Sequence, residues 1–195
     1  MPDGSTVITA GDRVVIIGSP ESVHSFADGL DPDHGAGADE EVAIFGGSEI
    51  GYHVARLLSE RGFNPRLIEQ DHDRARELAE ELPATQIMES DATDMEFLER
   101  ERVDEADVVV AALESDEKNL LVSLLAKRLG VDRTVAVIDT PAYVELFEAV
   151  GVDVAINPRI VVAEEITRLT QSEKTENVAL IESDKAEVIE VEVDA

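Results

Sequence analysis

Residues 41–69 read EVAIFGGSEIGYHVARLLSERGFNPRLIE, and the rest of the chain is most easily interpreted around this stretch. Its apolar run Val42–Phe45 contains β-branched residues and predicts a strand buried on both faces. The glycine turn 46–51 follows, then apolar residues at helical spacing as far as the helix-stop residue Gly62. A second short strand, 66–69, ends on an acid. This order of strand, glycine turn, helix, strand and acid, within about thirty residues, is the order that a dinucleotide-binding unit requires.

Each part of this unit has a physical role. Gly46 can adopt backbone angles that other residues avoid, so the chain can turn sharply from strand to helix. Gly51 has no side chain, so helix and strand can pack closely, and the free N–H groups of the first helical turn attract a pyrophosphate. Glu69 ends the second strand, where a carboxylate accepts hydrogen bonds from ribose hydroxyls and repels the extra phosphate of NADP.

The glycine pattern G-x-G-x-x-G is incomplete, because Ser48 stands in place of its second glycine. That is the position where the backbone must approach a pyrophosphate. The serine either crowds the ligand with its Cβ atom or bonds it through its hydroxyl, and the sequence leaves both readings open. A strand–turn–helix without any ligand is the alternative interpretation.

Composition limits the class of protein. The chain has 195 residues, 44% of them hydrophobic, which predicts one full domain with a real core and additional pieces. It has no cysteine, which excludes a disulfide framework, thiol chemistry and a cysteine zinc site. No apolar stretch approaches the length of a membrane span, so we expect a soluble, cytoplasmic protein.

The chain is strongly acidic, with a formal net charge of −28 and a pI near 4.2. Nucleic-acid binding and direct binding to anionic lipid are disfavoured, because both need a basic surface. An acid-rich and lysine-poor surface on an ordinary core is typical of proteins from salt-loving organisms, where salt screens the repulsion. The lysines are Lys118, Lys127, Lys174 and Lys185.

Strands and helices alternate through the centre of the chain. After the opening unit we expect strands over residues 86–89, 106–113, 134–138 and 152–156. Between them we expect helices over 73–81 (with Ala75, Leu78, Ala79 and Leu82 on one face), 115–129 and from Thr140–Pro141 to Gly151, together with an acidic helix capped by Thr93 or Asp94. Such alternation predicts an α/β fold, a doubly wound, Rossmann-like parallel sheet of about six strands, with partial β-rich segments flanking it.

The two ends of the chain hold pieces too small to be domains. Residues 5–18 read as a hairpin around Gly11–Asp12, followed by a helix from Ser19–Pro20. Residues 177–182 and 186–193 alternate as two strands. The helix expected over 159–170 has a wide apolar stripe, which either packs on its own sheet or docks on a neighbouring subunit.

Several motifs in order carry a family resemblance: VAIFGGSEIGYHVARLL, LIEQDHDRARELAEEL, ESDATD, ADVVVAALESDEKNLLVSLLAKRLG and PAYVELFEAVGVDVAINP. Over residues 41–170 the chain resembles the KTN domain, also called the RCK or TrkA N-terminal domain. This family comprises cytosolic nucleotide-binding regulatory subunits of Trk and Ktr potassium uptake systems. Residues 1–30 resemble the end of a TrkA-C domain, 31–40 read as a linker, and 171–195 resemble the first strands of a second TrkA-C domain. The resemblance therefore implies part of a longer, duplicated protein.

The resemblance also assigns site residues. It implies that the phosphate turn is formed by Gly46, Gly47, Ser48, Glu49, Ile50 and Gly51. It implies that Glu69 and Gln70 contact the adenosine ribose, and that Asp91 and Ala92 contact the adenine. Leu113 and Glu114 would then contact the nicotinamide or a terminal phosphate. The residue at position 49 is often basic in members that bind ATP. A glutamate there repels a terminal phosphate, so NAD(H) is favoured, with ATP or ADP as the alternative nucleotides.

Two functions from different classes remain. The resemblance implies a non-enzymatic, NAD(H)-binding regulatory subunit that gates a membrane-embedded Trk/Ktr potassium transporter. Such a subunit would be cytoplasmic, peripheral to the inner face of the membrane through its partner, and at least a homodimer. The alternative is a fragment of an NAD-dependent oxidoreductase without its substrate domain. We expect no catalytic and no metal-binding residues, because no catalytic motif occurs and the histidines (His24, His34, His53 and His72) do not cluster in sequence.

Overall fold

The computed structural model describes residue 7 and residues 40–170, 175–181 and 186–191. The chain separates into two units, Met1–Asp39 and Glu40–Ala195, and only the second is described beyond one residue. The predicted N-terminal hairpin, the helix from Ser19–Pro20 and most of the linker 31–40 lie outside the described residues.

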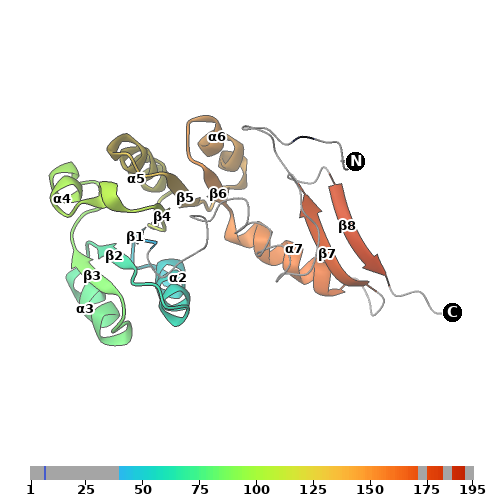
Figure 1. The fold of residues 1–195 in the computed structure, drawn as a ribbon, viewed down its shortest axis with the longest axis horizontal. Coiled ribbons are helices and arrows are strands. Elements are labelled where there is room, and N and C mark those ends of the chain that lie inside the picture. Colours follow the sequence, from blue (N-terminus) through green and yellow to red (C-terminus); the bar gives the residue numbers. More distant parts are fainter. Residues whose placement is uncertain (1–6, 8–39, 171–174, 182–185, 192–195) are drawn as a thin grey trace. The chain divides into compact units, whose positions relative to one another are not determined.

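A six-stranded sheet forms the framework of the second unit (Figure 1). Its strand order is β3-β2-β1-β4-β5-β6, and every neighbouring pair is parallel. The order reverses direction at β1, which lies between β2 and β4. The strands are β1 (Val42–Phe45), β2 (Arg66–Glu69), β3 (Gln86–Glu89), β4 (Val108–Ala111), β5 (Arg133–Val137) and β6 (Val154–Ile156). The predicted doubly wound α/β class is confirmed.

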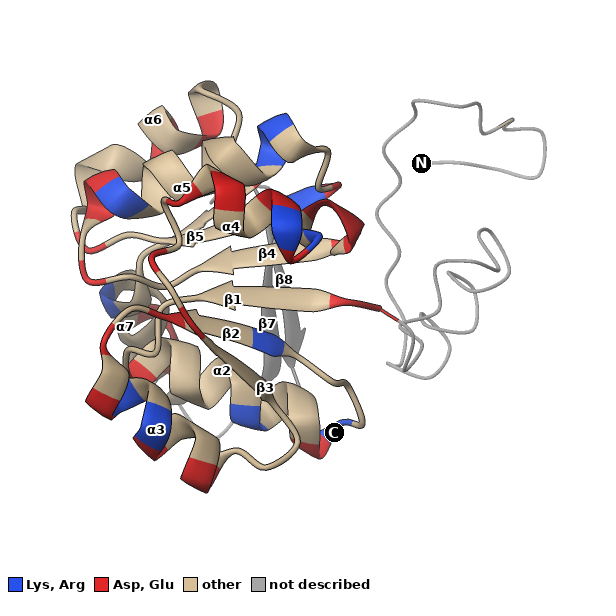
Figure 2. Ribbon diagram, turned by 90° about the vertical axis from the view of Figure 1, so that its left-hand side faces the viewer, with Lys and Arg blue, Asp and Glu red and all other residues tan. Residues whose placement is uncertain are grey.

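Helices cover both faces of the sheet (Figure 1). Helices α2 (Glu49–Glu60) and α3 (His72–Glu81) lie on one face. Helices α4 (Met95–Arg100), α5 (Asp116–Leu129) and α6 (Val144–Ala149) lie on the other, with the 3-10 turns η1 (Val103–Glu105) and η2 (Pro141–Tyr143). Figure 2 shows that the helices carry most of the charged residues, whereas the central strands are almost free of them.

Each face of the sheet has its own apolar layer. Under α2 and α3 the buried side chains include Ile44, Leu67 and Leu78. Under α4, α5 and α6 the layer is larger and includes Phe45 and Phe147. Since β1 and β4 are covered on both sides, their near-continuous apolar sequences are explained.

Two predicted strands are shorter in the structure, for reasons that local hydrogen bonds explain. The strand predicted over 106–113 is β4, which stops at Ala111, because the Asn119 side chain occupies both the N–H and the C=O of Leu113. The strand predicted over 152–156 is β6, which begins at Val154. Val152 N–H still bonds to the carbonyl of Phe147 at the end of α6.

One smaller prediction is wrong and another is confirmed. Ala79 was expected on the buried face of α3, but it is exposed, and Ala75, Leu78 and Leu82 form that face. Asp94, one of the two predicted caps, begins α4 and accepts hydrogen bonds from the backbone of Glu96 and Phe97.

The last described elements are α7 (Pro158–Thr170) and a hairpin. The apolar side chains of α7 are between 40% and 71% exposed, so the helix does not bury this face within the described residues (Ile160, Val161, Val162, Ile166 and Leu169). Strands β7 (Thr175–Ile181) and β8 (Ala186–Val191) form a separate antiparallel pair, where two strands were predicted over 177–182 and 186–193.

The role predicted for Gly51 is testable. A Cβ atom at this position would lie 2.0 Å from the backbone oxygen of Gly46, which cannot move without breaking the turn. We expect Gly51→Val to destabilise the fold by about 1–3 kcal/mol, through overpacking. Thermal denaturation measures this loss.

Leu57→Val is the matched control, since it places valine at a 41% exposed position of the same helix. Surface substitutions usually change stability by less than about 0.5 kcal/mol. Equal melting temperatures for the two variants would contradict the packing role of Gly51.

Candidate functional site

A cavity of about 980 Å³ lies at the carboxyl ends of β1, β2 and β4. This is the point where the strand order reverses, the usual place for a ligand in an open α/β sheet. Its size is at the upper end of the roughly 300–1,000 Å³ common for small-molecule sites. The residues that line it and were predicted for nucleotide binding are Gly46, Gly47, Ser48, Glu49, Glu69, Gln70, Leu113 and Glu114.

The glycine turn connects β1 to α2 in a space that excludes side chains. Gly46 has a φ of 105°, in the left-handed region, and a Cβ atom there would lie 2.6 Å from the backbone oxygen of Ala112. The Gly46 N–H bonds to the carbonyl of Ile68 at 2.8 Å. The turn is therefore held between the ends of β2 and β4, and the first turn of α2 begins at the wall of the cavity.

The carboxylate of Glu69 is fixed at the same wall. Its Oε2 accepts a hydrogen bond from Gly47 N–H at 2.7 Å, and its Oε1 accepts one from Asp71 N–H at 2.8 Å. A Cβ atom on residue 47 would lie 2.9 Å from this Oε2. Each carboxylate oxygen has a second lone pair, so the group can still accept hydrogen bonds from a ligand's hydroxyls.

Ser48 uses its hydroxyl within the protein. The hydroxyl donates to the carbonyl of Ala112 at 2.7 Å and accepts from Gly51 N–H at 3.3 Å, as the N-cap of α2. Its only proton is thus engaged. The serine that stands in place of the second glycine therefore connects the turn to the end of β4 through a hydrogen bond.

The cavity wall carries more negative than positive charge. Its acids are Glu49, Glu69, Asp71, Glu81 and Glu114, and its basic residues are Arg74 and Lys118. The guanidinium of Arg74 donates to the carbonyl of Gly47 at 2.9 Å and pairs with Glu77 at 3.1 Å.

Lys118 differs from Arg74, because its ammonium makes no hydrogen bond or close ion pair with any other residue that the structure describes. From the sequence, Lys118 was only one of four lysines in an acidic chain. Its place in the first turn of the helix after β4 was the signal that could have identified it, because that turn faces the carboxyl ends of the strands.

Four predicted site residues do not line the cavity: Ile50, Gly51, Asp91 and Ala92. Ala92 is buried in the apolar core. Asp91 accepts hydrogen bonds at 2.8 Å from the backbone N–H and the hydroxyl of Thr93, and these lower the pKa of its carboxyl. The predicted contact of Asp91 and Ala92 with adenine stays a prediction.

Two histidines fall within the described residues. His53 lines the cavity beside Tyr52, with the two rings 5.1 Å apart in an edge-to-face arrangement. His72 bonds to Glu89 at 2.8 Å, and this contact raises the pKa of the histidine. No group of three or more His, Asp or Glu side chains in the described part of the chain is arranged to hold a metal ion.

The first turn of α5 holds the cavity loop that follows β4. The side-chain Oδ1 of Asn119 accepts a hydrogen bond from Leu113 N–H at 2.8 Å, and its side-chain Nδ2 donates to Leu113 C=O at 2.9 Å. The Asp116 carboxylate accepts from the N–H groups of Asp139 and Thr140, at 2.7 and 3.0 Å. The loop after β4 and the loop after β5 are therefore joined to one helical turn.

The family model for the TrkA-N domain matches residues 42–158. A Trk system potassium uptake protein TrkA homolog from Archaeoglobus fulgidus is 43% identical over 99% of this chain and 43% of its own length. The TrkA protein of Haemophilus influenzae is 33% identical over 97% of this chain and 41% of its own length. The chain thus spans less than half the length of these relatives.

Solved structures share the fold. The TrkA-N domain of the inner membrane protein ybaL from Escherichia coli is 14% identical, with a TM-score of 0.61, over 68% of this chain and 97% of that one. The GsuK channel bound to NAD is 22% identical, with a TM-score of 0.61, over 83% of this chain and 31% of that one. GsuK bound to ADP is 25% identical, with a TM-score of 0.54, over 62% of this chain and 32% of that one.

None of the helices that the structure describes is both long and apolar enough to cross a membrane.

The contacts of Asp116 predict a pH dependence. Partial burial alone would raise the pKa of this carboxyl, but the hydrogen bonds from Asp139 and Thr140 outweigh it and hold the pKa below its ordinary value of 3.8. The stability that the contacts provide is therefore present above the unfolded pKa and lost as the pH falls through the folded pKa. We expect Asp116→Asn to be less stable than the parent at pH 7, with a difference that shrinks as the pH falls below about 4.

Urea denaturation at a series of pH values measures this difference. Asp104→Asn, which removes an exposed carboxylate, serves as the control and should show no such trend. A difference between Asp116→Asn and the parent that stays constant down to acid pH would show that the charge of Asp116 does not stabilise the two loops.

Proposed function

The chain belongs to the TrkA-N domain family, and on that premise we propose that it is an NAD(H)-binding regulatory subunit of a Trk-type potassium uptake system. One observation carries the ligand proposal: the glycine turn, the first turn of α2 and the Glu69 carboxylate meet in one cavity of sufficient size. The relatives named as potassium uptake proteins support the choice of partner.

The residues of the cavity fit an adenine dinucleotide. Backbone N–H groups at the start of α2 suit a pyrophosphate, because they carry the positive end of the helix dipole. Lys118 supplies a positive charge on the opposite, α5 side of the cavity. Glu69, held by Gly47 and Asp71, suits the hydroxyls of the adenosine ribose. The nicotinamide would supply any redox sensitivity of the site.

Charge favours NAD(H) over more anionic nucleotides. Glu69 would repel a 2′-phosphate, and Glu49, also at the wall, would repel the terminal phosphate of ATP. The GsuK structures, one bound to NAD and one to ADP, support an adenine nucleotide as the ligand class.

The regulatory role follows from the family rather than from catalytic groups. A bound nucleotide regulates a partner only through different affinities for two shapes of the assembly. We place this subunit in the cytoplasm, peripheral to the inner face of the membrane, where it would gate the transporter without catalysing a reaction. Turnover of a metabolite with NAD by the chain would favour the oxidoreductase alternative instead.

The flanking segments belong to the same proposal. The alignment to the Archaeoglobus fulgidus relative covers 99% of this chain, so it includes both flanks of the nucleotide-binding domain. We assign residues 1–30 to a TrkA-C-like domain, 31–40 to a linker, 41–170 to the nucleotide-binding domain and 171–195 to a second TrkA-C-like domain.

Glu69→Gln tests the ligand proposal. It keeps the shape of the side chain and one oxygen acceptor but loses the negative charge. We expect NAD affinity to fall by about 1–3 kcal/mol, as for the loss of hydrogen bonds to a charged group. Isothermal titration calorimetry measures the affinity of parent and variant.

Glu80→Gln removes the same charge from an exposed position on α3, where Glu80 pairs with Arg76, and should leave NAD affinity unchanged. Absence of NAD binding by the parent chain would overturn the proposed function. Equal affinities of Glu69→Gln and the parent would overturn only the ribose contact.

The exposed apolar residues of β6 and α7 support self-association. Val154 and Ile156 lie on the edge strand, and Ile160, Val162 and Ile166 continue on α7. An edge strand with apolar side chains is a ready template for pairing with another chain. We propose that this surface joins two copies of the chain, which gives at least a dimer.

Ile166→Glu tests this interface, because a charge buried without a partner is costly. Light scattering should give at least a dimer mass for the parent and a lower mass for the variant. Leu57→Glu, on an exposed part of α2, should keep the parent mass. A monomeric parent would refute the dimer, and an unchanged mass for Ile166→Glu would refute this interface.

A further inference from the structure

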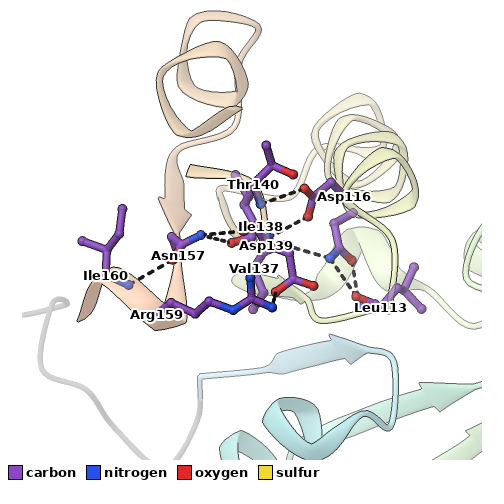
Figure 3. Close-up of polar contacts among 10 residues, drawn as sticks. Leu113, Asp116, Val137, Ile138, Asp139, Thr140, Asn157, Arg159 and Ile160 are labelled. Carbon is purple, nitrogen blue, oxygen red and sulfur yellow. Dashed lines mark hydrogen bonds and ion pairs between the residues drawn. The ribbon is translucent and has the colours of Figure 1, made fainter. Parts of the chain in front are cut away.

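Side chains bind the backbone of residues 137–140, the last residue of β5 and the loop after it, from two directions (Figure 3). On one side are Asn119 and Asp116 of α5, and on the other is Asn157, between β6 and α7. The loop therefore lies between the cavity of the proposed nucleotide site and the start of α7.

The contacts on the cavity side are made by a buried amide. Asn119 is 1% exposed. Its Nδ2 donates to the carbonyl of Leu113 at 2.9 Å and to the carbonyl of Val137 at 2.8 Å, and Leu113 is a residue of the cavity wall. Its Oδ1 accepts from Leu113 N–H. Leu113 thus cannot shift alone, because Asn119 would lose two hydrogen bonds in a buried place.

The contacts on the α7 side have the same character. Asn157 is 3% exposed, and its Nδ2 donates to the carbonyls of Ile138 and Asp139 at 2.8 and 3.0 Å. Its Oδ1 accepts from Ile160 N–H at 3.0 Å and so satisfies the first turn of α7. Asn157 therefore joins the loop after β5 to the start of α7, beside an exposed ion pair of 3.9 Å between Arg159 and Asp139.

Helix α7 is the element that can respond. Its described side chains beyond Pro158 are exposed, so few internal contacts fix its direction, and Asn157 is the buried polar residue at its start. A change in the loop 137–140 can thus alter the direction of the helix at little cost in packing.

We propose that Asn119 and Asn157 are positioning residues that couple occupancy of the cavity to the first turn of α7. A ligand that shifts Leu113 would move Val137 through Asn119, and the shift of residues 137–139 would reach Ile160 through Asn157. This inference rests on the proposed function, since it names how the nucleotide site would regulate the rest of the assembly. The coupling is reciprocal, so the state of α7 would also affect nucleotide affinity.

Asn157→Ser separates coupling from simple capping. Serine keeps an oxygen that can cap α7 but has no amide to donate to Ile138 and Asp139. Asn157 is not part of the cavity wall, so the ligand's own contacts are unchanged. Ser123→Ala is the matched control. It removes a buried hydrogen bond within α5, from Ser123 to the carbonyl of Asn119, without cutting the connection to β5.

Hydrogen exchange measured by mass spectrometry, with and without NAD, provides the readout. In the parent we expect NAD to slow exchange both in the loop 113–119 and in the first turn of α7, the latter by about fivefold or more if the coupling is of ordinary size. In Asn157→Ser the loop should still respond while α7 should not. Ser123→Ala should respond as the parent does at both places.

The outcomes separate the relay from the proposed function. If Asn157→Ser and the parent show the same NAD response in α7, or if Ser123→Ala also loses it, the relay is refuted while nucleotide binding stands. If the parent does not bind NAD, the proposed function is refuted. The relay is then tested by the hydrogen exchange of Asn119→Asp measured without ligand. Faster exchange at the start of α7 in Asn119→Asp than in Ser123→Ala supports the relay, and equal exchange refutes it.

Discussion

The close approach of the glycine turn to its neighbours is the constraint on which the site depends. Residue 51 lies against the carbonyl of Gly46, and Gly46 lies against the carbonyl of Ala112, so neither position has room for a side chain. Only this fit brings the first turn of α2 to the reversal point of the sheet, where the ends of β2 and β4 also arrive. The cavity, the position of Glu69 and the direction of α2 all follow from it.

Polar side chains around this turn are held in place by hydrogen bonds within the protein. Glu69 holds the turn to β2, Ser48 holds it to β4, and Asn119 holds the loop after β4 to β5. Preorganised groups of this kind reduce the ordering cost of binding. Ser48 also shows that a departure from a motif can be structural, since its hydroxyl performs a capping role that glycine could not.

The sequence predicted the sheet, the order of elements and half of the residues that line the cavity, because periodic apolar runs and glycine turns are local signals. Relationships across the fold were harder to predict. Leu113 was expected to continue a strand, because nothing local indicates that the Asn119 side chain would occupy its backbone. Asn157 was not singled out, because its partners lie 18 and 19 positions earlier in the chain and no local pattern indicates them. Lys118 was not distinguished from other surface charges, since its role depends on which loop it faces.

The acidity of the chain and its proposed anionic ligand act against each other. A net charge of −28 repels a dinucleotide at long range, but this field falls off over about 10 Å at 0.1 M salt and about 3 Å at 1 M. Backbone N–H groups of α2 and the ammonium of Lys118 would act at contact distance, where salt screens much less. Since the charges lie mainly on the helices, as Figure 2 shows, rising salt weakens the repulsion more than it weakens the local attraction. An acidic surface and a phosphate site are therefore compatible in this fold, provided that the site depends on donors within the cavity rather than on the field of the whole protein.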